Sequence, residues 1–454
     1  MSSEPKLFSR DVGGPYEPLI DDLERDCEDG KDLEAVRHVD QQEFSLIKYF
    51  CFFVVGLSMM WTWSMILQAV PFFQRRFRGS PWILRYFQAF YLVFFAFTML
   101  AVTLYLGMQF SRPSYTKRLH VALTTYVVVS TLLMLSTLSS VATTPYFAFT
   151  LIMVVATAVA NGLSQNAAFA FAARFGRTEY APAIMTGEAL AGLLPSTIGL
   201  RPIPVICCTL SLHEQEIGSA LAFPSEYFDV DVSETGHTSW LTLSYFLSAA
   251  VVGVASIHAL QYLARHAPPQ TSPKVFLKSS NYTNLASKLR YPASANFLCL
   301  CISSVSPVFI SKITSVVPID NAHVLSRPQA FIPMAIVLWN IGDFLGSVLA
   351  VRSLFLLRYP GMMVGLSLAR LGFIPLYLMC NIDGRGSAMG DWFYLIIVQF
   401  LFGLSHGWLS GASMMGVTVW VGEEEREEAG AFMGMTLVIG LVAGSLLGLL
   451  AAQA

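Results

Sequence analysis

Long apolar runs, separated by shorter polar segments, fill the chain after its first 46 residues. A membrane-spanning helix needs about 20 mostly apolar residues, and the chain holds eleven such runs, in which Gly and Pro are tolerated. The runs are Lys48–Phe73, Tyr86–Phe110, Leu119–Thr143, Phe147–Ala173, Ala181–Leu200, Ser239–Leu263, Pro292–Ser315, Pro328–Val351, Pro360–Ile382, Asp391–Val421 and Glu428–Ala452. The pattern predicts an all-α, polytopic membrane protein with eleven transmembrane helices.

The composition of the 454 residues agrees with this prediction. Hydrophobic residues make up 54% of the chain and charged residues only 13%, whereas a soluble domain has about 45–50% and about 25%. The mean hydropathy is +0.57. These values argue against a soluble enzyme, a nucleic-acid-binding protein and a disordered protein, and they make the lipid bilayer a partner of the chain.

The first 46 residues differ from the rest, with 13 acidic and 5 basic side chains. Such a polar, charged segment is typical of a disordered, solvated terminus. Within it, Tyr16-Glu-Pro-Leu19 resembles a tyrosine-based sorting signal. We interpret residues 1–46 as an acidic, disordered cytoplasmic tail that can engage sorting adaptors through Tyr16–Leu19.

The orientation follows from Lys and Arg in the segments between the runs, because cytoplasmic loops are enriched in both. With a cytoplasmic N-terminus, 18 Lys and Arg residues, including 5 in the first 46 residues, lie on the cytoplasmic side and 8 on the opposite side. The cluster between Arg75 and Arg85 opposes the trend. The count predicts a cytoplasmic N-terminus and, with eleven spans, a C-terminus on the other side.

Two longer polar segments predict the domain organisation. Residues 201–238 are acidic and form a predicted lumenal or extracellular loop within an N-terminal bundle, helices 1–6 over residues 47–264. Residues 265–291 are basic and contain Pro and Ser, which indicates a cytoplasmic linker. Helices 7–11 over residues 292–454 then form a C-terminal bundle.

Ionisable groups inside a span are costly and therefore mark functional sites by default. Glu188, Asp343 and Arg370 lie within predicted spans, and Asn161 and Gln165 share one face of the fourth because they are four residues apart. Two interpretations stay open. These side chains can bind a substrate, or they can pair with one another and fix the packing of the helices.

The sequence contains no pattern typical of a catalytic, metal or cofactor site. No two histidines within a span are four residues apart, the seven cysteines have no metal-ligand spacing, and there is no Walker A sequence. An intramembrane enzyme would need such a cluster, and a sensor would need a folded domain larger than the tail. We therefore expect neither catalysis nor a bound metal or cofactor.

Several segments agree in order and spacing with one known family. They are Asn161-Gly-Leu-Ser-Gln-Asn, Tyr180-Ala-Pro-Ala-Ile-Met-Thr-Gly-Glu-Ala-Leu-Ala-Gly192, Trp339-Asn-Ile-Gly-Asp-Phe-Leu-Gly346, Arg370-Leu-Gly-Phe-Ile-Pro-Leu-Tyr-Leu-Met-Cys-Asn381 and Gly403-Leu-Ser-His-Gly-Trp-Leu-Ser410. Through these motifs the chain resembles the equilibrative nucleoside transporters, the solute carrier 29 type. The resemblance implies a major-facilitator-like arrangement of six plus five helices and facilitated diffusion of purine or pyrimidine nucleosides by alternating access, with nucleobases as a second substrate class.

The resemblance also implies a substrate site. Trp63 and Leu67 would line a central cavity, Gln165 would hydrogen-bond the base, and Asp343 would accept from the ribose hydroxyls. Asn161 and Ser347 complete the set of substrate-binding residues that we expect. A nucleoside is neutral, so a site with an amide, one carboxylate and apolar walls suits it.

Three positions depart from the family pattern. Ser347 stands where the family usually has an Arg one helical turn after the Asp, Ser64 stands in place of an Asn, and Glu188 replaces a Gln. Asp343 then either pairs with Arg370 or carries a proton, because a buried carboxylate without a cation is costly. Glu188 and Arg370 are therefore candidate proton-carrying or ion-pair residues.

These departures keep a second function open, a proton-coupled nucleoside transporter of the vacuolar or lysosomal membrane. The plasma membrane is the other location that agrees with the sequence.

Overall fold

The computed structural model describes residues 44–108, 114–198, 237–269, 279–310, 312–317, 326 and 328–453. The sorting signal at Tyr16–Leu19, nearly all of the predicted tail and most of the loop at 201–238 lie outside these residues. Within the predicted linker at 265–291, residues Ser279–Lys288 form a short helix.

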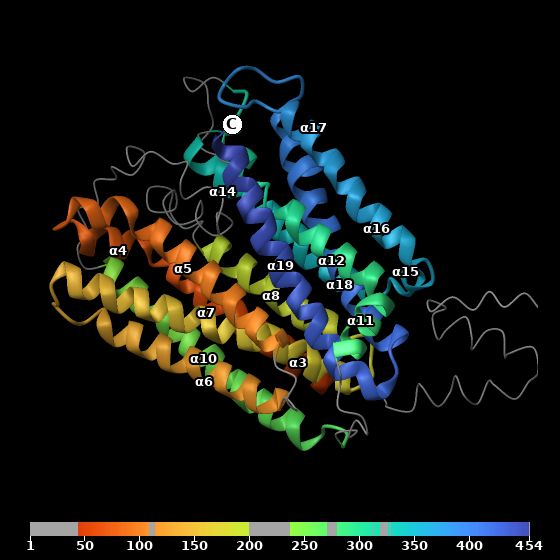
Figure 1. Ribbon diagram of the computed structural model, residues 1–454. Helices are drawn as coiled ribbons and strands as arrows, with labels where there is room; N and C mark the ends of the chain where they lie inside the picture. The colour runs from red at the N-terminus through yellow and green to blue at the C-terminus, as the bar shows by residue number, and fades with distance from the viewer. Residues whose placement is uncertain are drawn as a thin grey trace, which may run out of the picture.

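The described residues are almost entirely helical (Figure 1). The longer helices are α3 (Leu46–Gln68), α5 (Pro81–Met108), α6 (Tyr115–Ser136), α7 (Thr143–Arg174), α8 (Tyr180–Ile198), α10 (His237–Arg265), α12 (Arg290–Ser303), α14 (Pro328–Ala350), α16 (Pro360–Ala369), α18 (Leu401–Trp420) and α19 (Arg426–Gln453). The shorter ones are α4 (Val70–Phe77), α11 (Ser279–Lys288), α13 (Pro307–Ile310), α15 (Leu354–Arg358), η5 (Arg370–Gly372), α17 (Phe373–Leu378), η6 (Phe393–Phe400) and η7 (Glu423–Glu425). Each of the eleven apolar runs therefore contains helix among its described residues.

Ten of the spans in the described residues are long and apolar enough to cross a membrane. The predicted fifth span, which corresponds to α8, is not among them. Its 19 residues include Glu188, several small residues and Pro195. The chain is thus a multi-pass membrane protein, while the count of eleven spans stays a prediction.

Proline explains why two predicted spans are interrupted in the structure. Pro307 has no N–H for the carbonyl of Ser303 four residues earlier, and α12 ends at Ser303, whose carbonyl accepts from the Ser306 hydroxyl at 2.8 Å. Pro375 has the same effect on the carbonyl of Leu371, and α16 gives way there to the 3₁₀ turn η5 and then α17. The tenth span begins as the π-helix η6 before α18.

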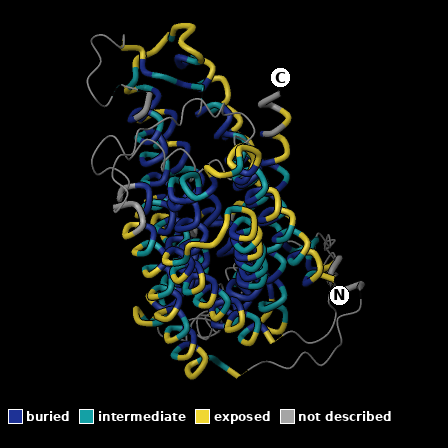
Figure 2. Tube along the Cα trace, turned by 90° about the vertical axis from the view of Figure 1, so that its left-hand side faces the viewer, coloured by how far each residue is buried: buried dark blue, intermediate teal, exposed yellow. Residues whose placement is uncertain are grey.

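Polar and apolar side chains are distributed as expected for a lipid-embedded chain. Figure 2 shows buried residues along the middle of the bundle and exposed ones on its outside. Large apolar side chains face outward, such as Phe97, Ile152 and Val251, which are 56%, 62% and 60% exposed. Asn296, Gln399 and other polar side chains are instead buried. Lipid solvates the exterior, so polar groups gain most by pairing with each other inside.

The helices form two groups that meet along the middle of the molecule (Figure 1). In the first group α3 packs against α8 and α10, and α7 packs against α5 and α6. In the second, α14 packs against α18, and α12 against α16, α18 and α19. Contacts of α7 with α19 and of α8 with α14 join the two groups.

Glycines bring two helix pairs into backbone contact. A Cβ atom on Gly342 of α14 would lie 2.2 Å from the carbonyl oxygen of Phe400, and one on Gly407 of α18 would lie 2.0 Å from that of Asp343. Gly56 of α3 and Gly187 of α8 show the same relation between their own helices. Small residues permit this close approach, which adds dispersion contacts between membrane helices.

The contact at Gly342 yields a direct test of its role in stability. Gly342→Ala should lower the stability by about 1–3 kcal/mol, the usual cost of overpacking, because its methyl group would displace backbone. The measurement is the melting temperature of the purified protein in detergent. Gly365→Ala is the matched control, because no atom lies within 4 Å of its Cβ position. Equal melting temperatures for the two variants would contradict the packing argument.

Candidate functional site

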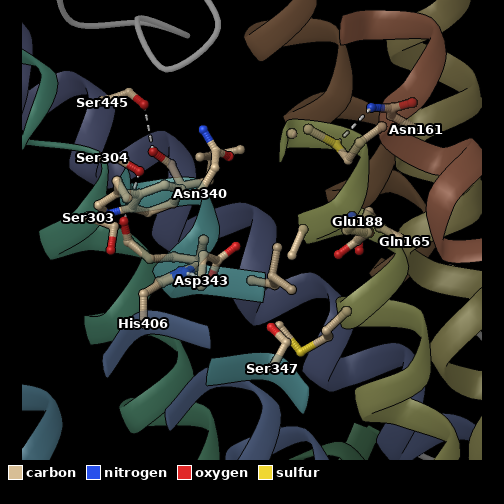
Figure 3. A pocket seen from close by; sticks show the side chains of 18 of the residues that line it. Asn161, Gln165, Glu188, Ser303, Ser304, Asn340, Asp343, Ser347, His406 and Ser445 are labelled. Atoms are coloured by element: carbon tan, nitrogen blue, oxygen red, sulfur yellow. Dashed lines mark hydrogen bonds and ion pairs between the residues drawn. The ribbon is translucent and has the colours of Figure 1, made fainter. Parts of the chain in front are cut away.

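A cavity lies between the two helix groups (Figure 3). Its volume is about 190 Å³, far more than the roughly 10–15 Å³ that one water molecule requires. The residues that line it are Met60, Phe95, Met99, Asn161, Gln165, Met185, Glu188, Ala189 and Gly192 from the first group and Leu300, Ser303, Ser304, Pro307, Trp339, Asn340, Asp343, Ser347, His406, Leu437, Leu441 and Ser445 from the second. The cavity thus has room for a small organic molecule.

On the wall formed by the first group, an amide and a carboxyl group contact each other. The Nε2 atom of Gln165 on α7 donates to Oε1 of Glu188 on α8 at 2.7 Å. Because an ionised carboxylate only accepts, the amide nitrogen has to face it. The Oε1 atom of Gln165 is buried and has no partner among the described residues. This wall therefore presents a free acceptor to the cavity.

The opposite wall holds a carboxylate–imidazole pair. Oδ1 of Asp343 on α14 lies 2.7 Å from Nδ1 of His406 on α18, and both residues are only 8% exposed. Figure 3 shows these two side chains across the cavity from Gln165 and Glu188. Their close approach depends on Gly407, the residue after His406, which contacts the backbone of Asp343. The pair supplies a partner for the carboxylate of Asp343.

Four of the residues that line the cavity carry an unpartnered polar atom. Besides Oε1 of Gln165, these atoms are Nε1 of Trp339, Oγ of Ser347 and Nε2 of His406, all buried and without a hydrogen-bond partner in the described part of the chain. Leaving a buried polar atom unpaired costs about 1–3 kcal/mol. The cavity is therefore arranged to receive a ligand that offers both hydrogen-bond donors and acceptors.

Comparisons with known proteins agree with this arrangement. Residues 284–452 match the family model described as nucleoside transporter. The yeast Saccharomyces cerevisiae nucleoside transporter FUN26 is 26% identical over 447 residues, covering 88% of this chain and 83% of that protein. Human equilibrative nucleoside transporter 1 is 26% identical, covering 66% of this chain and 68% of its own length. The chain is a relative of the equilibrative nucleoside transporters.

Solved structures identify the fold of this nucleoside transporter relative. The E. coli fucose:proton symporter FucP has a TM-score of 0.54 at 14% identity, covering 90% of this chain and 96% of FucP. The human organic anion transporter MFSD10 has the same TM-score at 13% identity, covering 91% and 96%. Both likenesses concern the fold alone. They confirm the prediction of a helical, major-facilitator-like fold.

The structure brings together most of the site residues expected for an equilibrative nucleoside transporter. Asn161, Gln165, Glu188, Asp343 and Ser347 all line the cavity. They come from the consecutive helices α7 and α8 and from the distant helix α14, and they converge because α8 packs against α14 and α7 against α19.

Three of the expected residues lie elsewhere. Trp63 is fully buried and stacks on Phe95, with ring centroids 3.9 Å apart, so that Phe95 and not Trp63 lines the cavity. Leu67 is buried in an apolar cluster of the first group and also lies outside the lining. Neither Trp63 nor Leu67 is among the residues that line the cavity, and both are buried in the apolar cluster of the first helix group.

Arg370 is the third expected residue that lies outside the lining, and the groups that accept its hydrogen bonds are uncharged. Its guanidinium group donates to the carbonyl of Cys299 at 2.8 Å, to Oγ of Ser303 at 2.8 Å and to Oγ of Ser405 at 3.1 Å, and it lies over the ring of Phe402. Of the two alternatives left open for Asp343, pairing with Arg370 is not observed, because Asp343 contacts His406 and Arg370 lies beside these other acceptors.

The sequence reasoning missed His406. The signal was a histidine inside a span, next to a glycine and in the same half of the chain as Asp343. No spacing rule links residues 63 positions apart, however, so only the packing of α14 on α18 reveals the pair. For metals, no group of three or more His, Cys, Asp or Glu side chains in the described residues could hold an ion.

The partners of Arg370 predict its effect on stability. Arg370→Met keeps much of the side-chain volume but leaves several buried acceptors without a donor, and each of these costs about 1–3 kcal/mol. We expect a clearly lower melting temperature in detergent. Asp343→Asn is the comparison, because Asp343 provides no partner for the guanidinium group. If Asp343→Asn lowered the melting temperature as much as Arg370→Met, an ion pair between the two residues would be supported instead.

Proposed function

We propose that this chain carries nucleosides across a membrane by facilitated diffusion with alternating access. The observation that carries the proposal is the cavity between the two helix groups, which has apolar walls, an amide on one side and a carboxylate on the other. The similarity to equilibrative nucleoside transporters over most of the chain supports the same substrate class. Nucleobases form a second class that this cavity can accept.

The two polar walls suit the two ends of a nucleoside. Gln165 would bind the base through Oε1, which Glu188 leaves free by occupying the amide nitrogen. Asp343 would accept a ribose hydroxyl, with Asn161 and Ser347 as further polar contacts. A substrate held in this way touches both helix groups at once, so its binding is coupled to their relative position.

The charge of the lining favours a neutral substrate. Glu188 and Asp343 line the cavity, and none of its lining residues is Lys or Arg. A phosphorylated nucleoside would bring negative charge next to these two acids without a cation to offset it. We therefore propose a nucleoside, with no phosphate group, as the transported species.

We propose that the two bundles, residues 47–264 and 292–454, move relative to each other about the cavity. An ion pair connects them at one end of the molecule. Nε of Arg174 on α7 lies 3.4 Å from Oε1 of Glu427 on α19. The segment at 265–291 would link the bundles on that side. In alternating access this connection would open while the opposite end closes.

For the location we propose a cytoplasmic N-terminus, on the basis of the Lys and Arg distribution, and sorting through the acidic tail. The plasma membrane and the vacuolar or lysosomal membrane both agree with these features. A fluorescent fusion at the C-terminus, imaged with markers of both membranes, distinguishes them.

Uptake tests the function directly. Cells that lack their own nucleoside carrier should take up labelled adenosine or uridine when they express this chain, and preloaded cells should release the label. Asp343→Ala should reduce uptake at least tenfold, because the substrate loses a charged acceptor. Glu424→Ala, which removes an exposed acid of η7, should leave uptake unchanged. Absence of flux at every pH, with the protein present in the surface membrane, would overturn the proposal.

A second candidate is proton-coupled transport of the same substrates. The observation that favours it is that three titratable groups face the cavity, Glu188 from α8, Asp343 from α14 and His406 from α18. A proton taken up on one side of the membrane could travel with the substrate on any of them. Gln165 is the neutral group that contacts Glu188.

A pH series distinguishes the two candidates. Facilitated diffusion predicts no rise in uptake toward pH 5, because no proton travels with the substrate. Proton coupling predicts that uptake rises toward pH 5. Glu188→Gln should abolish this rise, because the new amide can keep the hydrogen bond to Gln165 but cannot take up or release a proton in this pH range. Glu424→Gln is the matched control. The same acid stimulation in Glu188→Gln and Glu424→Gln would exclude Glu188 as the coupling group.

A further inference from the structure

The geometry points to His406 as a substrate-binding residue that determines specificity. We propose that Nε2 of His406 and the carboxylate of Asp343 form a pair of acceptors for two adjacent hydroxyl groups of the substrate sugar. This inference rests on the proposed function and extends it to a residue that neither the motifs nor the spacing of the sequence indicates.

The first step concerns which nitrogen of His406 carries the proton. Oδ1 of Asp343 lies 2.7 Å from Nδ1 of His406. A carboxylate only accepts, so Nδ1 of His406 has to donate, and the neutral ring then keeps a lone pair on Nε2. Asp343 is in this respect a positioning residue, because it sets both the orientation of the ring and the tautomer.

The second step concerns where Nε2 lies. His406 lines the cavity, is only 8% exposed, and its Nε2 atom has no partner among the described residues. The ring of Trp339 lies at 5.5 Å between centroids and 30° to the imidazole, which supports the ring from one side. Trp339, Asp343 and Ser347 are four residues apart on α14, so their side chains lie on the same face of this helix.

The third step concerns the ligand. The carboxylate oxygen of Asp343 that does not contact His406, together with Nε2 of His406, offers two acceptors in neighbouring positions. Two acceptors require two donors, and the adjacent hydroxyl groups of a ribose supply them on one rigid ring. Where the family pattern has an Arg, which only donates, this chain has Ser347 and uses an acceptor from α18 instead. The site should therefore depend strongly on both sugar hydroxyls.

The experiment compares two substitutions at one position. His406→Asn keeps an amide near the place of Nδ1, so it can still donate to Asp343, but it has no atom at the place of Nε2. His406→Gln is longer and can place its amide oxygen as an acceptor near the Nε2 position. His258→Asn is the control, since His258 is exposed on α10 away from the cavity.

The readout is uptake of adenosine against 2′-deoxyadenosine and 3′-deoxyadenosine. In the unmodified chain we expect adenosine to be preferred about tenfold over at least one analogue, as for the loss of one hydrogen bond in a buried site. His406→Asn should lower adenosine uptake to the level of that analogue and leave the analogue unchanged. His406→Gln should retain part of the preference, and His258→Asn all of it.

The outcomes separate this inference from the proposed function. If the unmodified chain carries no nucleoside, the proposed function itself fails. If it carries adenosine but His406→Asn keeps the full preference for adenosine, the role of His406 fails alone. If neither His406 variant reaches the membrane, the acceptor pair can still be tested in the unmodified chain. The measurement is then competition of the two deoxy analogues against uptake of labelled adenosine. Equal competition by adenosine and both analogues would overturn the acceptor pair.

Discussion

Contact between helix backbones at glycine positions is the constraint on which the cavity depends. On α14 and α18 the glycines at 342, 346, 403 and 407 all face carbonyl groups of the other helix. A side chain at any of them would separate the helices, and the 2.7 Å contact between Asp343 and His406 would be lost. The pair α3 and α8 is held in the same way in the first group, where α8 carries Glu188. Both polar walls are thus attached to closely packed helix pairs.

The balance of polar groups inside the bundle separates structural residues from binding residues. Arg370 is buried and charged, yet carbonyl and hydroxyl groups satisfy it, and it joins α12, η5 and α18. Gln165, Ser347 and His406 each retain a buried atom without a partner in the described residues. Since lipid offers no hydrogen bonds, these atoms depend on water or substrate in the cavity.

The change at Ser347 and the presence of His406 belong together physically. A buried carboxylate needs a partner, and the family pattern provides an Arg on the same helix, one turn away. In this chain the neighbouring helix provides an imidazole instead. The local charge falls, because the imidazole can stay neutral, and the cavity gains an acceptor where the family pattern places a donor. The same exchange places a third titratable group in the cavity besides Glu188 and Asp343, which is why pH is informative about the mechanism.

The sequence by itself determined the class of the protein, the approximate positions of its helices and five of the residues that line the cavity. Burial in lipid depends on the composition of each run alone, so the spans could be predicted without knowing their neighbours. The polar residues inside them, Gln165, Glu188 and Asp343, stood out for the same reason.

Only the tertiary structure decided which of these groups meet. It placed His406 beside Asp343, Glu188 beside Gln165 and Phe95 in front of Trp63. It also placed Arg370 among neutral acceptors. Such pairings depend on how helices cross and rotate against each other. That geometry is set by contacts such as Gly407 against Asp343, between residues far apart in the chain, which no local pattern encodes.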